Sequence, residues 1–516
     1  MRVSFRLLPL LFFLFVSIHA TKAKDSAEVL ALNAASSNAA VANTAIAELR
    51  LAGPAGMRML MNQYAEEIAR HISNPTAAAS PEWQRISAAL DAVSQQRNSY
   101  LSGLYWYTDL SEARRVSAQT GKPILSLRLL GKLTDELSCA NSRFFRTVLY
   151  SNVAISATLR NEFILHWQTV RPVPLITIDF GDGRKLQRTI TGNSIHYVLD
   201  SDGQVIDAIP GVYGPAAFTR SLAASEILFA SLKRKTDNEK RRLLMDHYSS
   251  LNNKISLAWL ADVTKLGGKK PEGVSVLVND KGEALSIMPL AVSKALTEAS
   301  VLRSMTAGSE ALGRITDEET WNRIAEIHKA DAVLDDQSVS LIKKQNPNLS
   351  SEELTNLLNK FQNSVALDTV RNEYRMRTRL LAWLMSNSLR SDVDKFNDKV
   401  YAELFFTPKT DPWLGLLMPD AYTAIDNSGV VKSNQLIKAP SSRDRRRPRL
   451  PASSRTNSIS SASSSGFIWT RAGEDACGPR TMGLVKRLRF SLALPHNPAQ
   501  PLIKVENTTC AEPSCS

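Results

Sequence analysis

The chemistry that this chain could perform begins with a single thiol. Cys139, in the stretch LSCANSRFF at residues 137–145, is the only cysteine among the first 470 residues, and Ser142 follows it three positions later. A thiolate attacks disulfides and forms mixed disulfides, which a second nearby thiol normally resolves. With serine at that second position, Cys139 is either a mono-thiol redox centre or a small apolar side chain that fills a gap.

The segments around Cys139 predict that it lies at the start of a helix between two strands. KPILSLRLLG and ILHWQTV are short apolar runs, and SRFFRTVLY and NVAISATLRNEF between them are helical in character. We therefore predict that residues 122–130 and 163–170 form neighbouring parallel strands, joined by a right-handed helical connection that contains Cys139. A helix N-terminus would favour the thiolate, and Arg143 and Arg146 one turn later could add to this effect.

The segments that follow predict two hairpins and a closing helix. PLITIDF and KLQRTITG flank the turn GDG, and NSIHYVLD and QVIDAIPG flank the turn SDG. PAAFTRSLAASEILFASL then has helical character. Strands that alternate with helices and end in a hairpin indicate an α/β sandwich.

This order of elements resembles the thioredoxin-like superfamily over about residues 104–230, and it is most similar to exported bacterial thioredoxin-domain proteins. In those proteins a Lys-Pro strand precedes the redox motif and an Asp-x-Asp-Gly hairpin follows it, as KPILSL and DSDG do here. The resemblance implies that Cys139 matches the attacking cysteine and that Ser142 replaces the resolving one. It also puts Ser194 where the family has a cis-proline, so ordinary dithiol exchange is not expected.

Other residues with chemical potential have simpler interpretations. His166 and His196 fall on predicted adjacent strands and could pair with the Cys139 thiol, although strand histidines usually face solvent or a hydrogen-bond partner. Asp179, Asp182 and Asp200 could gather a calcium ion, but no loop here has the EF-hand spacing. We interpret these three carboxylates as turn residues.

Helical segments flank the predicted α/β unit on both sides. Residues 25–75 are rich in alanine, and the chain is mainly helical from about residue 236 onward. Two capping boxes support the second region, Thr316 with Glu319 and Ser350 with Glu353. One of its helices carries three arginines at four-residue spacing, and we expect a solvated basic face rather than a partner-binding one; these are Arg371, Arg375 and Arg379.

The two ends of the sequence differ in composition from the rest. The first residues read MRVSFRLLPLLFFLFVSIHATKAKD, a basic start, an apolar run and small residues, which is typical of a secretory signal peptide. An uncleaved anchor is the alternative reading. Residues 431–516 hold 14 Lys/Arg and 5 Asp/Glu and carry +9 of the net charge of +13, which leaves +4 for the other 430 residues. This Ser/Arg-rich tail cannot bury enough apolar surface to fold, so we expect disorder there rather than a basic binding arm.

The sequence therefore predicts an α/β protein with a thioredoxin-like domain between helical segments. The expected parts are a signal peptide (1–23), an N-terminal helical segment (24–100), the thioredoxin-like domain (101–235), a mainly α-helical C-terminal domain (236–430) and the tail (431–516). We expect a periplasmic or extracellular, non-catalytic binding module whose partner is another envelope protein. The alternative is a mono-thiol redox protein that uses Cys139 and Ser142. No cofactor, metal ion or nucleic acid is expected, nor a transmembrane segment after signal cleavage.

Overall fold

The structure is a computed structural model that describes residues 26–189, 192–267, 312, 316–386, 390–414 and 430. These residues all belong to one compact unit that ends at Val430. The predictions for the signal peptide and for the tail at 431–516 fall outside the described residues.

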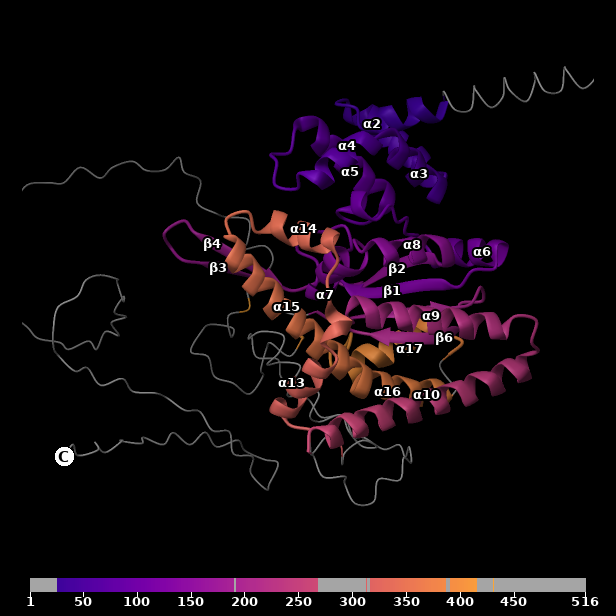
Figure 1. The fold of residues 1–516 in the computed structure, drawn as a ribbon. Helices are drawn as coiled ribbons and strands as arrows, with labels where there is room; N and C mark the ends of the chain where they lie inside the picture. Colours follow the sequence, from indigo (N-terminus) through magenta and orange to yellow (C-terminus); the bar gives the residue numbers. More distant parts are fainter. Residues whose placement is uncertain are drawn as a thin grey trace, which may run out of the picture. The chain divides into compact units, whose positions relative to one another are not determined.

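A four-stranded mixed sheet carries the fold, with the strand order β2-β1-β5-β6 (Figure 1). The strands are β1 (Ile124–Leu130), β2 (Ile164–Arg171), β5 (Ser194–Leu199) and β6 (Val205–Pro210). Strand β1 pairs in parallel with β2 and antiparallel with β5, and β6 pairs antiparallel with β5. The predicted parallel pair is therefore confirmed. Every residue of β1, β5 and β6 is buried, which explains why these runs are almost continuously apolar.

Helices connect and cover these strands. Between β1 and β2 the chain forms α7 (Ala140–Phe144), the π-helical segment η2 (Phe145–Leu149) and α8 (Val153–Glu162). Helix α6 (Leu110–Thr120) contacts β1 and β2, and α9 (Pro215–Leu232) contacts β6, η2 and α8. The helical connection that contains Cys139 and the closing helix after the DSDG hairpin are thus present as predicted.

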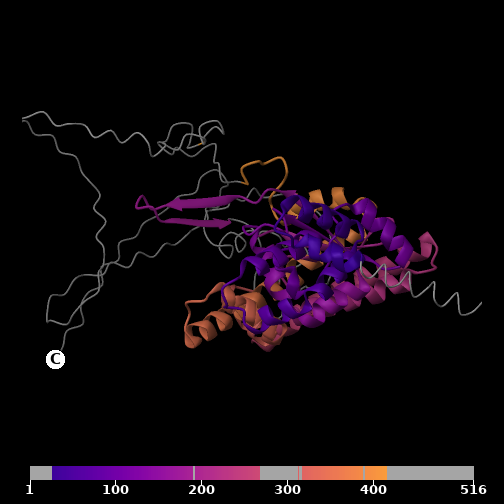
Figure 2. The ribbon, with the colours of Figure 1, turned by 90° about the horizontal axis from the view of Figure 1, so that it is seen from above.

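A second, separate sheet consists of the hairpin β3 (Leu175–Asp179) and β4 (Lys185–Thr189), which lies between β2 and β5 in sequence. Figure 2 shows it as a two-stranded ribbon of its own. Gly181 and Gly183 have positive φ angles of 76° and 95°, a conformation that glycine adopts without strain, so DFGDG is a turn as predicted.

The flanking helices share one hydrophobic cluster with the sheet, which runs from Ala31 to Phe405. At the N-terminal side residues 26–34 are helical, and Arg50 donates hydrogen bonds to the carbonyls of Val93 (2.8 Å) and Trp106 (3.0 Å). The N-terminal helices are α2 (Ala39–Leu51), α3 (Pro54–Gln63), α4 (Ala65–Ser73), α5 (Pro81–Ser94) and the short η1 (Ser99–Leu101). The C-terminal ones are α10 (Asp237–Lys265), α13 (Glu318–Ile327), η3 (Lys329–Ala332), α14 (Asp336–Gln345), α15 (Ser351–Arg371), η4 (Asn372–Arg377), α16 (Thr378–Met385), α17 (Val393–Lys399) and η5 (Val400–Leu404). Among the described residues, no helix combines the length and the apolar character that crossing a membrane requires.

One of the two predicted capping boxes is confirmed and the other is wrong by one residue. Ser350 and Glu353 bond reciprocally at the start of α15. At α13 the cap is Asp317, which accepts from the Thr320 N–H at 2.8 Å. Thr316 is buried instead, where it accepts a bond from the indole of Trp259 at 3.2 Å. The physical reason is that a carboxylate caps a helix as well as a hydroxyl does, and the hydroxyl is needed in the core.

The expected solvated basic face is also wrong. Arg371 and Arg375 are buried and lie over the Trp321 ring, with guanidinium carbons 5.9 and 6.0 Å from its centre. Arg371 also pairs with Glu318. Because the segment η4 is π-helical and has a wider turn than an α-helix, residues four positions apart do not lie on one exposed face here. Cation–π contacts and an ion pair stabilise these arginines in the core.

Candidate functional site: the Cys139 motif and a basic pocket

Cys139 and Ser142 are both fully buried. Cys139 occupies the N-cap of α7, but its side chain caps no backbone N–H. The Ser142 hydroxyl donates to Ser138 Oγ at 2.5 Å and lies 3.1 Å from the Cys139 carbonyl oxygen. Helix α7 has five residues and continues directly into the π-helical segment η2.

The two arginines that could have favoured a thiolate bond to the loop before it. The Arg146 guanidinium is buried and donates to the carbonyls of Leu133 (3.2 Å), Asp135 (2.8 Å) and Glu136 (3.4 Å). Arg143 donates to the Ser138 carbonyl at 2.7 Å and to Thr189 Oγ1 at 2.9 Å. Burial lowers the pKa of Arg146 to about 10. Both side chains therefore bond to the loop that precedes Cys139.

The segment before β5 lies directly on the motif. Asn141 donates from Nδ2 to Ser194 Oγ at 2.8 Å. A Cβ atom added to Gly192 would lie 2.8 Å from Asn141 Oδ1 and 3.2 Å from the Cβ of Ala140, so only glycine fits there without a shift. Ser194 thus faces the motif, as the resemblance implied, and no cis peptide bond occurs among the described residues. This segment therefore packs against the first residues of α7.

Neither histidine hydrogen-bonds to Cys139. His166 Nδ1 bonds with Ser126 Oγ at 2.8 Å, and His196 Nε2 bonds with Tyr150 Oη at 2.7 Å. The other nitrogen of each ring is buried without a hydrogen-bond partner in the described part of the chain. Burial lowers the pKa of both imidazoles to about 3. The possible thiol–imidazole pair is therefore absent, and each histidine bonds a hydroxyl, in line with the simpler interpretation.

The three turn aspartates do not gather. Asp179 accepts from the Gly181 N–H at 3.0 Å and Asp182 from the Arg184 N–H at 3.0 Å, in the β3–β4 turn. Asp200 accepts from Asp202 N (3.0 Å) and Gln204 N (2.8 Å) in the β5–β6 turn. Within the described ranges, no three His, Cys, Asp or Glu side chains are close enough to hold a metal ion. The interpretation as turn carboxylates is confirmed.

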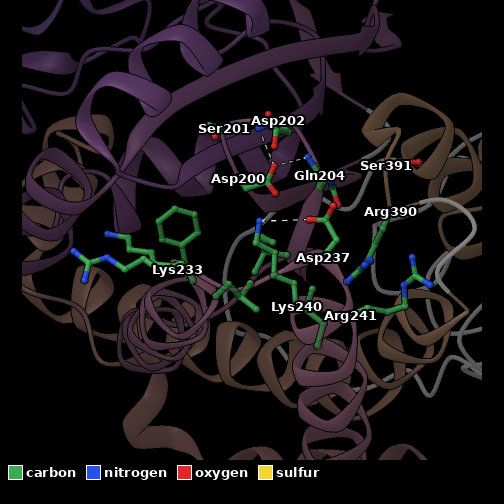
Figure 3. Close-up of a pocket in the computed structure, with 15 residues that line it drawn as sticks. Asp200, Ser201, Asp202, Gln204, Lys233, Asp237, Lys240, Arg241, Arg390 and Ser391 are labelled. Carbon is green, nitrogen blue, oxygen red and sulfur yellow. Dashed lines mark hydrogen bonds and ion pairs between the residues drawn. The ribbon is translucent and has the colours of Figure 1, made fainter.

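A pocket of about 400 Å³ opens beside the β5–β6 turn (Figure 3). Its walls come from that turn, from the link between α9 and α10, from the first turns of α10 and from the residues just before α17. Ile206, Phe229, Leu232 and Leu244 supply its apolar surface. Its charged residues are Asp200, Asp202, Lys233, Arg234, Asp237, Lys240, Arg241 and Arg390.

Local structure explains how these charges come together. Helix α9 ends at Leu232, and α10 begins after Thr236, whose hydroxyl and the Glu239 carboxylate form a capping box. Within this short link Arg234 has φ +61°, which is strained for a residue other than glycine. The Arg390 carbonyl accepts from the Val205 N–H at 2.9 Å, which fixes the last cation beside β6.

A second cavity, of about 260 Å³, lies against α9, α10 and η4. His328 Nε2 bonds with Asp262 Oδ2 at 2.7 Å, and Tyr374 donates to the same oxygen at 2.6 Å. The bond to Asp262 raises the pKa of His328. The Tyr374 hydroxyl also lies 3.3 Å from His328 Nε2, so the three side chains form a polar brace between α10, α13 and η4.

Sequence reasoning missed the basic pocket because its residues come from four separate segments. One local signal was present, the basic run KRK at residues 233–235 just before a helix start. Comparison of the chain with protein-family models, with curated proteins and with solved structures finds no match.

Proposed function

We propose that the chain is a thioredoxin-like, non-catalytic binding module of the cell envelope, in which Cys139 packs the core and performs no redox step. The observation that carries this proposal is the complete burial of Cys139 and Ser142. The adjoining Ala140 and Asn141 pack against the Gly192–Ser194 segment, and Arg146 bonds to the loop before the motif. A thiol that exchanges disulfides must be reached by a partner sulfur in line with the bond that breaks.

The thioredoxin-like part of the proposal is supported by the sheet. Its order β2-β1-β5-β6, with one parallel pair and a final antiparallel hairpin, agrees with the resemblance stated from the sequence. The motif follows β1 at a helix start, and Ser194 faces it through Asn141. Placement in the envelope, with another envelope protein as partner, is supported by the leader-like composition of the first residues.

A mono-thiol redox role is the second candidate, and one observation favours it: Cys139 occupies the N-cap position that attacking cysteines take in the family it resembles. The two candidates differ in the accessibility of the thiol. Alkylation of the native full chain with N-ethylmaleimide at neutral pH distinguishes them, because peptide-level mass spectrometry separates Cys139 from Cys477, Cys510 and Cys515. The binding-module proposal expects Cys139 to react only after unfolding in urea.

Two matched variants test the packing role. Cys139→Ser puts a hydroxyl into an apolar site and should lower the free energy of unfolding by about 1–3 kcal/mol. Cys139→Ala keeps the site apolar and leaves only a small cavity, so its cost should be smaller. Rapid alkylation of native Cys139, together with unchanged stability of Cys139→Ser, would instead establish the redox candidate.

A further inference from the structure

Charge distribution distinguishes the basic pocket from an ordinary surface cleft. Five cationic and three anionic residues line it. Lys233, Arg234 and Arg241 form no ion pair with any described residue, whereas Lys240 lies 3.9 Å from Asp237. A concave site with an excess of one sign of charge concentrates ions of the opposite sign.

The acidic residues do not cancel this excess. The Asp200 carboxylate is occupied by the two backbone N–H groups of its own turn. Burial also raises the pKa of Asp200, which makes its ionised form less favourable. Asp237 stands at the first position of α10 with its side chain almost fully exposed. The interior of the pocket is therefore net positive.

The remaining surface includes an apolar wall beside uncharged polar residues. Ile206, Leu232 and Leu244 are buried side chains on the pocket wall, and Phe229 lies under the Lys233 ammonium, 5.4 Å from the ring centre. Figure 3 shows Lys240 beside Asp237, Arg241 and Arg390 near each other on one side, and Lys233 on the opposite side. A pocket of about 400 Å³ suits a small molecule rather than a polymer strand or a protein segment.

We propose that this pocket binds a small organic anion, a phosphate monoester attached to an apolar group. Arginine forks and lysine ammonium groups from several directions match the three outer oxygens of a phosphate monoester. The apolar wall takes the organic part, so inorganic phosphate alone binds more weakly. The inference goes beyond the proposed function, whose partner is another envelope protein, and its test is independent of Cys139.

The strain at Arg234 supports a functional reason for this residue. A left-handed backbone at a non-glycine residue destabilises the fold unless another role retains it. Glycine adopts that backbone freely. Arg234→Gly should therefore raise the melting temperature and at the same time weaken binding, a combination that a purely structural arginine would not produce.

The test uses the full-length protein and isothermal titration with phenyl phosphate, inorganic phosphate and phenol. Phenyl phosphate should bind tighter than inorganic phosphate, and phenol should not bind. Arg241→Gln and Arg234→Gly should each weaken phenyl phosphate binding about tenfold, the loss of one charge-assisted hydrogen bond. Arg242→Gln, which removes the same charge from the next residue of α10 outside the pocket, should change affinity less than twofold.

The source of the phosphate monoester is distinguished by vesicles. Co-flotation with phosphatidic acid vesicles, and not with phosphatidylcholine vesicles, identifies a lipid headgroup, whereas binding of phenyl phosphate alone identifies a soluble ligand; either result supports the shared chemistry. Absence of phenyl phosphate binding at millimolar concentration overturns the proposal. Equal losses in Arg241→Gln and Arg242→Gln also overturn it, because they would indicate a diffuse surface charge effect. If phenyl phosphate does not bind but native Cys139 is alkylated slowly, the ligand proposal is rejected and the packing role of Cys139 is kept.

Discussion

At the scale of single residues, the buried histidines make the free energy of unfolding depend on pH. His166 and His196 are fully buried and have one ring nitrogen each without a partner among the described residues. Both imidazoles must gain a charge if they are protonated in the folded state, and burial opposes this by lowering their pKa to about 3. Their ordinary pKa of about 6.5 returns when the chain unfolds.

The sign of the effect follows from this difference. A group with a depressed folded pKa contributes stability that is fully present above about pH 6.5 and is lost as the pH falls toward 3. The free energy of unfolding lost over this pH range is on the order of several kcal/mol for each histidine. His328 has the opposite sign, because its bond to Asp262 raises its pKa, so its contribution is present below about pH 6.5 and is lost as the pH rises through the raised value.

We predict opposite pH profiles for two histidine variants. His196→Gln keeps an acceptor for the Tyr150 hydroxyl but cannot titrate, so its free energy of unfolding should approach or exceed that of the wild type as the pH falls from 8 to 5. His328→Gln should lose most stability, relative to the wild type, at pH 5 and least at pH 8. Urea unfolding at several pH values measures both. Parallel profiles would show that neither histidine changes its pKa on folding.

At the scale of elements, the segment that leads into β5 packs against the Cys139 motif. Gly192 packs against Ala140 and Asn141, and Ser194 accepts a hydrogen bond from Asn141. Tyr401 of η5 donates to the Asn193 carbonyl at 3.1 Å and holds the same segment from the other side. Residues 192–194 are thus held between α7 and the C-terminal helices.

We predict that Gly192→Ala displaces this segment from the motif. The added Cβ would meet Asn141 Oδ1 at 2.8 Å, so the segment must shift, at a cost of about 1–3 kcal/mol in the free energy of unfolding. Alkylation of Cys139 in the native protein should become faster. In an Asn141→Ala background the same substitution should cost less, because the clashing oxygen is gone. Equal costs in both backgrounds would show that the contact with Asn141 is not what restricts residue 192.

At the scale of the whole molecule, the hydrophobic cluster depends on segments far beyond the α/β unit. Phe396 of α17 and Tyr401 of η5 are almost completely buried, and Tyr197 of β5 bonds to Asn397 at 3.3 Å. A buried salt bridge joins Asp207 of β6 to Arg377 of η4 at 2.9 Å. The sheet and the C-terminal helices therefore contribute to one core.

We predict that a chain ending at residue 430 keeps the melting temperature of the full chain, since all described core residues precede that point. A chain ending at residue 391 should lose several kcal/mol or fail to fold, because it lacks the large side chains of α17 and η5. Thermal unfolding followed by circular dichroism compares the three chains. A drop in melting temperature for the 430-residue chain would contradict the expectation that the tail is dispensable.

The sequence determined the parts of the protein that depend on local order. Apolar runs, turn residues and helix starts predicted the parallel pair β1–β2, both hairpins, the closing helix α9 and the cap at Ser350. These features arise from periodicity and from backbone preferences of neighbouring residues, which a sequence displays directly.

Only the tertiary structure decided the environment of each polar side chain. Cys139 is sealed, His166 and His196 bond to hydroxyls, and the arginines at 371 and 375 are buried over Trp321. The basic pocket likewise assembles four segments that lie up to about 190 positions apart in sequence. The burial and the charge partners of a side chain depend on which distant residues pack against it. A shift of one residue, at a π-helical turn or at a helix cap, is enough to change those neighbours.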